Sequence, residues 1–203
     1  MAKLLGLTTD GLLDRFASPD PTPGGGSAAA LAGATAAALA AMVCAMPKTR
    51  TNLDSERERL ATALGWAKEA GSRLRSLVQE DSEAYDAVVA AYRLPKATEE
   101  EKAARREQVA MAMARATEVP LRTAEACLVV MSAAAEALAH GNPNASSDAR
   151  TAGALAWAGL LGAAANVRIN AGSLGDAAGG ILERIDALLA EGRNRVGGLG
   201  LPV

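Results

Sequence analysis

The fold is decided by residues 18–46, which read SPDPTPGGGSAAALAGATAAALAAMVCAM. Residues 19–26 cannot form a helix, because each proline restricts the residue before it and three consecutive glycines leave the backbone loose. Residues 27–46 are almost all small and apolar, which predicts a smooth helix. Ser27 is well placed as the N-cap of that helix, since its hydroxyl can accept a hydrogen bond from a free backbone N–H.

Two interpretations of this junction stay open. A glycine-rich loop that runs into a helix N-terminus offers free N–H groups and a positive dipole end, so it can hold an anion or another ligand. Alternatively, the segment is a close-packed core helix with an irregular lead-in. In both cases alanines and Gly33 allow other backbones to come close, so we expect this helix at the centre of the fold with neighbours all round.

The composition favours one helical domain. The chain has 203 residues, enough to bury a core in one domain. Half of the residues are apolar but only 2% are aromatic, and alanine supplies much of the apolar count. No segment alternates as a strand does. We predict an all-α domain over residues 1–203, a bundle of about six to eight long helices around the central Ala/Gly-rich helix. Residues 193–203 are expected to be a loose tail.

Charge and hydropathy limit the partners. The net charge of -2 gives no reason to expect nucleic acid, so an anionic ligand needs a local positive patch. Residues 27–46 have the length of a membrane span, but alanine is weakly apolar and no aromatic belt flanks them. We expect a cytoplasmic protein without a signal peptide or membrane contact. Cys44 and Cys127 lie in apolar runs and are expected to be buried free thiols, and no metal-ligand spacing is present.

Two long helices are predicted after the first junction. Apolar residues at steps of three and four predict a long helix that Asn52 or Asp54 caps and that can run to Tyr92. Thr98 and Glu101 have the spacing of a capping box, which predicts the start of the next helix. That helix should end at Gly141, and Pro120 is expected to kink or break it.

Two further helices are predicted near the C-terminus. Ser147 or Asp148 is expected to cap a helix that runs to about Ala171. Asp176 is expected to begin a last helix that ends before Gly192.

Asp81 is the unusual member of an apolar stripe formed by Leu74, Leu77, Tyr85 and Val88. One interpretation is a structural acid at the edge of the core, hydrogen-bonded to a neighbouring group. The other is a chemically useful carboxylate, because desolvation raises the pKa of a buried acid.

Other polar residues lie on the later helices. Asn166 and Asn170 are one turn apart, and two buried amides on a helix of small residues need a backbone or a ligand as partner. His140 is the only histidine, and its place at a helix C-terminus favours an interaction with the last carbonyls over catalysis.

In four motifs the chain resembles the formiminotetrahydrofolate cyclodeaminase and methenyltetrahydrofolate cyclohydrolase family. The resemblance extends from about residue 12 to 189, and residues 94–105, LPKATEEEKAAR, look particularly like the free-standing bacterial cyclohydrolases. Order and spacing make the four motifs specific together: PGGGS at residues 23–27; Asp81, Ala84 and Tyr85 before Leu94, Pro95 and Lys96; Gly141 and Asn142 before Ser147 and Asp148; and NVRIN at residues 166–170.

This resemblance implies an all-helical homodimer that acts on a tetrahydrofolate derivative, with or without a polyglutamate tail, and needs no metal or other cofactor. It implies three catalytic candidates, Asp81 as general base or as the carboxylate that steadies a cationic substrate, Lys96 for charge or a proton, and Asp148 as runner-up to Asp81. The substrate-binding candidates are Pro23, Gly24, Gly25, Gly26, Ser27, Tyr85, Asn166 and Asn170.

The leading expectation is a methenyltetrahydrofolate cyclohydrolase, a hydrolase that opens the cyclic amidine of 5,10-methenyltetrahydrofolate to give 10-formyltetrahydrofolate. A cyclodeaminase that releases ammonia from 5-formiminotetrahydrofolate needs much the same groups and is the alternative. A non-catalytic helical folate-binding or scaffold protein is a more distant one. Its support is residues 47–52, which are shorter than the corresponding basic and aromatic segment of family members and bring one wall of the folate pocket into question.

Overall fold

The computed structural model describes residues 3–175 and 178–201. In these residues the secondary structure is entirely helical, as the sequence predicts. Six α-helices and two short 3-10 helices follow one another in the order η1 (Leu4–Gly6), α1 (Thr9–Ala17), α2 (Gly25–Cys44), α3 (Asp54–Tyr92), α4 (Glu99–His140), η2 (Pro143–Ala145), α5 (Ser146–Ala171) and α6 (Ala178–Gly198).

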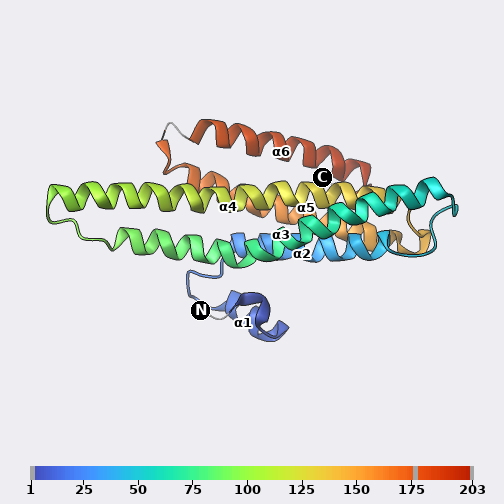
Figure 1. The fold of residues 1–203 in the computed structure, drawn as a ribbon, viewed down its shortest axis with the longest axis horizontal. Helices are drawn as coiled ribbons and strands as arrows, with labels where there is room; N and C mark the ends of the chain where they lie inside the picture. Colours follow the sequence, from blue (N-terminus) through green and yellow to red (C-terminus); the bar gives the residue numbers. More distant parts are fainter. Residues whose placement is uncertain (1–2, 176–177, 202–203) are drawn as a thin grey trace.

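Helices α2 to α5 form an elongated bundle (Figure 1). The long helices α3 and α4 are antiparallel neighbours, and the turn between them extends well past the start of α2. Helix α6 lies over α4 and α5, whereas α1 lies on another side of the bundle, below α2 and α3 in Figure 1. The capping box of Thr98 and Glu101 is present at the start of α4.

Small residues let α2 come close to its neighbours. A Cβ added at Gly33 would lie 2.6 Å from Cys127 Sγ on α4, and one added at Gly159 on α5 would lie 2.8 Å from the carbonyl oxygen of Ala29. Neither position has room for a side chain, because real Cβ atoms essentially never approach other heavy atoms this closely. The alanine and glycine content of residues 25–44 is therefore a packing requirement.

The expectation that α2 has neighbours all round is wrong for the single chain. Helices α3, α4 and α5 pack against it, but Ala28, Thr35, Ala38 and Met42 are exposed. By length and hydropathy, α2 and residues 143–171 would both pass as membrane spans, and in the bundle 56% and 44% of their apolar windows are buried. Both are bundle helices with one apolar side left open.

Two expectations about helix ends are also wrong. Pro120 does not break α4, which is helical from Glu99 to His140, so of the expected kink or break only the break is excluded. Helix α6 continues past Gly192 to Gly198, and Val196 and Leu199 are buried, so residues 193–199 are not a loose tail. The expected start of the last helix at Asp176 falls outside the described residues.

Candidate functional site

Asp81 of α3 points at the first turn of α2. A Cβ added at Gly26 would lie 2.1 Å from Asp81 Oδ1, so the carboxylate occupies the space that a side chain at Gly26 would need. Ser27 Oγ donates a hydrogen bond of 3.0 Å to Asp81 Oδ2. The glycine motif is thus an opening that lets a carboxylate of α3 reach the backbone of α2.

Ser27 is not the N-cap of α2. The helix begins at Gly25 with Gly24 as N-cap, which places Ser27 in the first turn. Its hydroxyl also lies 3.1 Å from the hydroxyl of Ser82. Because the Ser27 hydroxyl hydrogen is used on Asp81, Ser82 must be the donor in that second contact. A hydrogen-bonded relay therefore runs from the Ser82 hydroxyl to the Ser27 hydroxyl and from there to the Asp81 carboxylate. Ser27 links α2 to α3 by this hydrogen bond and does not cap its own helix.

Burial dominates the electrostatics of Asp81. Desolvation raises the pKa of its carboxyl above the ordinary value of 3.8, and the hydrogen bonds from the Ser27 side chain and backbone oppose this rise without cancelling it. The two hydrogen bonds from Ser27 therefore stabilise the charged carboxylate, but burial still makes that form less favourable than it is in an exposed aspartate. A carboxylate in this state takes up a proton more readily than an exposed aspartate does.

The loop before α2 is fixed from two sides. Thr22, which precedes Pro23, donates from its hydroxyl to Asp86 Oδ1 over 3.4 Å, and its carbonyl accepts from Arg15. Thr22 and Pro23 are both buried, whereas Gly25 is exposed. The loop therefore has a defined position next to the N-terminus of α2.

Asn166 joins this cluster from α5. A Cβ built at Gly25 would lie 3.5 Å from Asn166 Nδ2, so the amide is adjacent to the exposed glycine. Asn166 Nδ2 donates to the Gly162 carbonyl at 2.9 Å. Tyr85 lies one turn beyond Asp81 on α3, on the same side of the helix, and is 45% exposed.

Asn170 has a structural partner. Its Nδ2 donates to the carbonyl of Ala116 on α4 over 2.7 Å. Ala116 is four residues before Pro120, and a proline has no N–H to give to that carbonyl. The Asn170 amide nitrogen therefore has a partner within the protein, and a ligand is not required to satisfy it.

The chain does not bring Lys96 or Asp148 to Asp81. Lys96 is exposed beyond the end of α3, and Tyr92 is already about 16 Å along the helix from Asp81. Asp148 lies in the first turn of α5, about 27 Å along that helix from Asn166. Ala145 is the N-cap of α5, so neither Asp148 nor Ser147 has the expected capping position. A role for Lys96 or Asp148 in the reaction stays a prediction.

The shortened segment over residues 47–52 also lies at the far end of α2. Arg50 donates from its side chain to the carbonyls of Leu138 and Ala139, which terminate α4. Thr49 donates to Glu56 Oε2 over 2.6 Å, and this hydrogen bond, together with that from the Thr51 N–H, lowers the pKa of the Glu56 carboxyl to about 2. Arg50 is therefore a helix cap here, and Lys48 is exposed beside it.

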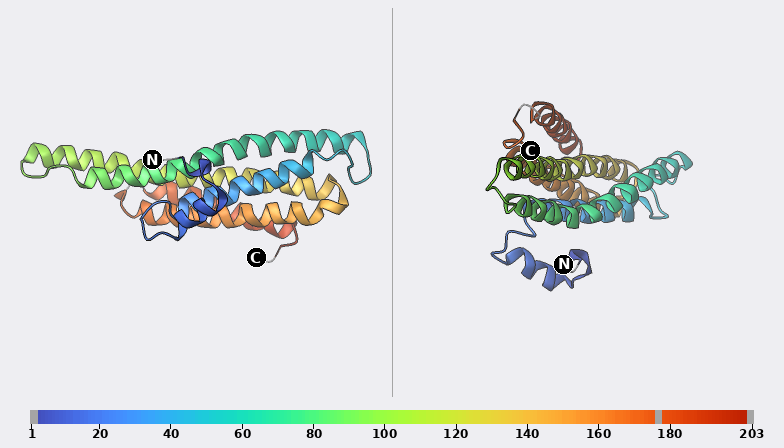
Figure 2. Two further views of the ribbon diagram at one scale, coloured as in Figure 1. Left: turned by 90° about the horizontal axis from the view of Figure 1, so that it is seen from below. Right: turned by 60° about the vertical axis from the view of Figure 1, so that its left-hand side comes forward.

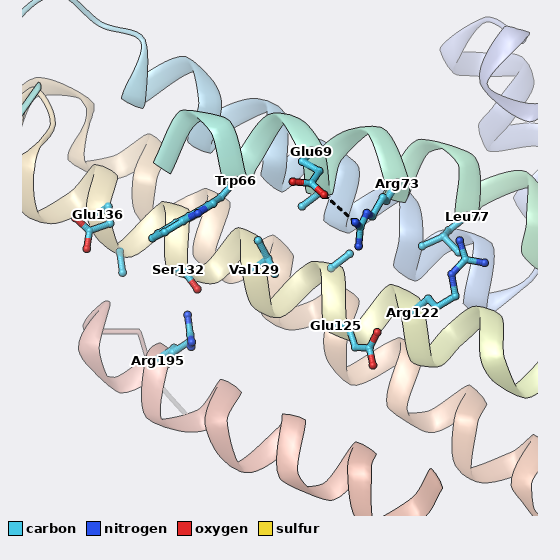
Figure 3. Close-up of a pocket in the computed structure, with 13 residues that line it drawn as sticks. Trp66, Glu69, Arg73, Leu77, Arg122, Glu125, Val129, Ser132, Glu136 and Arg195 are labelled. Carbon is cyan, nitrogen blue, oxygen red and sulfur yellow. Dashed lines mark hydrogen bonds and ion pairs between the residues drawn. The ribbon is translucent and has the colours of Figure 1, made fainter. Parts of the chain in front are cut away.

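A groove of about 720 Å³ lies elsewhere, between α3, α4 and the end of α6 (Figure 3). Its lining includes Trp66 and Val129 and the charged side chains of Arg73, Arg122 and Arg195, and no predicted site residue is among them. Arg73 and Arg122 are paired with Glu69 and Glu80. Within the described part of the chain, no group of three or more His, Cys, Asp or Glu residues has the arrangement of a metal site.

The cluster of Gly25, Gly26, Ser27, Asp81 and Asn166 is the candidate site. Four of these residues were expected from the glycine motif and from the carboxylate on the apolar stripe, and Asn166 from its place among small residues. Ser82 was missed, and the signal available was its position directly after Asp81 on the same helix. Chemically, the cluster offers a desolvated carboxylate for a cation or a water, with backbone N–H groups and an amide around it.

Comparisons with known proteins show the family to which the chain belongs. The family profile described as Formiminotransferase-cyclodeaminase matches residues 8–180. A methenyltetrahydrofolate cyclohydrolase from Methylorubrum extorquens is 41% identical over 91% of this chain and 89% of its own length. The formimidoyltransferase-cyclodeaminase of Sus scrofa is 34% identical over 85% of this chain, which spans about a third of that longer protein (32%).

A solved structure has the same fold. The formiminotetrahydrofolate cyclodeaminase from Thermotoga maritima superposes with a TM-score of 0.83 at 25% identity, over 95% of this chain and 93% of that one. The all-helical bundle and the family profile together define the class, and the chain belongs to the formiminotransferase-cyclodeaminase family.

Proposed function

We propose that the protein is a methenyltetrahydrofolate cyclohydrolase that converts 5,10-methenyltetrahydrofolate and water to 10-formyltetrahydrofolate and a proton. The observation that carries the proposal is the Asp81 carboxylate, desolvated against Gly26 and held by Ser27. The sequence identity to the Methylorubrum cyclohydrolase supports the reaction over other activities in the family.

The chemistry matches a buried carboxylate. The substrate is a cationic amidinium, so its bridging carbon is already electrophilic and an anion nearby favours its binding. Asp81 accepts a proton from water as the water oxygen bonds to that carbon. The bond from the carbon to N5 then breaks, N5 takes up a proton, and loss of the remaining hydroxyl proton leaves the formyl group on N10. One proton is released overall. No step requires a redox change.

The surrounding groups suit the rest of the substrate. The exposed Gly25 and the Asn166 amide offer hydrogen bonds to a pteridine edge, and the Tyr85 ring offers an aromatic surface. We also propose that the protein works in the cytoplasm as a homodimer, uses no metal or other cofactor, and accepts the folate with or without a polyglutamate tail.

The test is the loss of methenyltetrahydrofolate absorbance on addition of the purified protein. Cyclohydrolase activity predicts stoichiometric formation of 10-formyltetrahydrofolate at a rate proportional to enzyme. The cyclodeaminase, which the Thermotoga relative's name suggests as second candidate, predicts ammonia release from 5-formiminotetrahydrofolate. Folate binding with no turnover of either substrate would instead indicate a binding protein.

A further inference from the structure

The N-terminal segment, residues 3–22, is anchored on the bundle in front of α2. Helix α1 lies outside the bundle that α2 to α5 form, and a loop joins it to the start of α2 (Figure 2). Leu4 and Leu12 of this segment are nevertheless buried and belong to the hydrophobic core. The Leu4 N–H also donates to Gln79 Oε1 on α3 over 3.0 Å. The side chains of α1 therefore have a defined position beside the loop.

Thr22 connects this segment to α3. Its carbonyl accepts a hydrogen bond from Arg15 Nη2 at 3.2 Å, and its hydroxyl donates to Asp86 Oδ1 over 3.4 Å. We call these two contacts the Thr22 clamp. Gln79 and Asp86 precede and follow Asp81 on α3. The N-terminal segment is thus tied to the stretch of α3 that carries the candidate base.

The clamp adjoins the most flexible part of the candidate site. Gly24, Gly25 and Gly26 have no side chains, so this stretch has more conformational freedom to lose than any other residues would have. Its C-terminal side is fixed by the first turn of α2 and by the hydrogen bond from Ser27 to Asp81. On its N-terminal side the Thr22 clamp supplies the fixed point. The exposed Gly25 lies between these two anchors.

We propose that Arg15 and Asp86 are positioning residues for the reaction, because they hold Thr22. Through Thr22 they keep Gly24 and Gly25 in the conformation that receives the substrate. A loop that is already ordered loses less entropy on binding, so the clamp lowers KM. It has little effect on kcat, because the carboxylate and its hydrogen-bond donors are held by α2 and α3 themselves. The kinetic effect rests on the proposed function, whereas the clamp itself does not.

Steady-state kinetics tests the Arg15 side of the clamp. Arg15→Met removes the donor to the Thr22 carbonyl and keeps most of the aliphatic side chain. KM should rise about tenfold, which is the usual cost of ordering one more backbone residue on binding. The value of kcat should stay within about twofold of wild type. Asp20→Asn is the control, because it alters the other Arg15 contact and should leave both constants unchanged. A wild-type KM in Arg15→Met, or a loss confined to kcat, would overturn the proposal.

A matched pair of variants separates the hydrogen bond of Asp86 from its charge. Asp86→Ala removes the acceptor of the Thr22 hydroxyl and should raise KM about tenfold, whereas Asp86→Asn keeps an acceptor oxygen and should stay near wild type. Thr22→Val should match Asp86→Ala, and Thr22→Ser should restore the wild-type KM. The double variant should be no worse than either single one, because both remove the same contact. Equal rises in KM for Asp86→Ala and Asp86→Asn would assign the effect to charge and overturn the clamp.

Amide hydrogen exchange tests the clamp without reference to activity. The Ala28 N–H donates to the Gly24 carbonyl over 3.0 Å, so its exchange rate reports how firmly the loop is held. Exchange at Ala28 should be faster in both Arg15→Met and Thr22→Val and unchanged in Asp20→Asn. The amide of Met131, which is fully buried in α4, reports global unfolding and should exchange equally in all these proteins. Unchanged exchange at Ala28 in both clamp variants would overturn the proposal.

The two measurements distinguish failure of the proposed function from failure of the clamp. An inactive wild type in which Ala28 exchange still responds to the clamp variants contradicts the proposed function alone. An active wild type in which Ala28 exchange does not respond contradicts the clamp alone.

Discussion

The Asn170 side chain replaces the hydrogen bond that Pro120 cannot make. Asn170 Nδ2 donates to the Ala116 carbonyl over 2.7 Å, and this is the carbonyl that an N–H at position 120 would bind. A side chain of α5 thereby supplies the hydrogen bond that α4 lacks at Pro120, which explains how α4 continues through a proline. We call this contact the repair.

This repair predicts a stability coupling. Asn170→Ala leaves the Ala116 carbonyl without a donor and should lower the free energy of unfolding by about 1–3 kcal/mol. In a Pro120→Ala background the restored N–H binds that carbonyl, so the same substitution should cost clearly less. Urea unfolding of the four proteins measures both costs. Equal costs in the two backgrounds would contradict the repair.

Replacement of Asp81 should separate activity from stability. Asp81→Asn keeps the shape and removes the base, so turnover per folded molecule should fall by about two to four powers of ten. The raised folded-state pKa means that the ionised Asp81 costs stability at neutral pH, and the benefit of the neutral acid is complete only below its unfolded pKa. The melting temperature at pH 7 should therefore stay equal or rise. A lower melting temperature with normal turnover would make Asp81 a structural acid.

The Ser27 hydroxyl should set the pH dependence. Asp81 acts as a base only when ionised, so the acid limb of the kcat/KM profile should lie above the ordinary aspartate pKa of 3.8. Ser27→Ala removes a donor that favours the charged carboxylate, so the pKa of Asp81 should rise further and the acid limb should move to higher pH. Ser82→Ala affects only the next hydroxyl in the relay and should shift the limb less. A shift to lower pH in Ser27→Ala would exclude this arrangement.

Gly25 and Gly26 should differ in how well they tolerate a side chain. Gly26→Ala places a Cβ on Asp81 and must displace the carboxylate, and a displacement of 1 Å can cost about a hundredfold in rate. Gly25→Ala meets only the Asn166 amide at ordinary contact distance and should reduce the rate far less. Steady-state kinetics on the two variants, with circular dichroism as the folding control, gives the comparison. Similar losses in both would count against the contact between Gly26 and Asp81.

Local sequence determined much of the fold. The long helices could be placed from local signals: the capping box of Thr98 and Glu101, the periodicity of α3 and the alanine content of α2. Such signals are readable in the sequence because capping and helical periodicity depend on residues a few positions apart. The candidate residues Gly26, Ser27 and Asp81 could likewise be named from a glycine motif and one carboxylate on an apolar stripe.

Only the tertiary structure decided what these residues do for one another. Ser27 bonds Asp81 across two helices instead of capping its own. Asn170 donates to the Ala116 carbonyl of α4, where Pro120 alone predicted a kink or a break. The same structure separates Asp148 and Lys96 from Asp81, although all three belong to the motifs of one family. The physical reason is that a free hydroxyl, amide or carbonyl takes the partner that packing brings within about 3 Å, and that partner is many residues away in the chain.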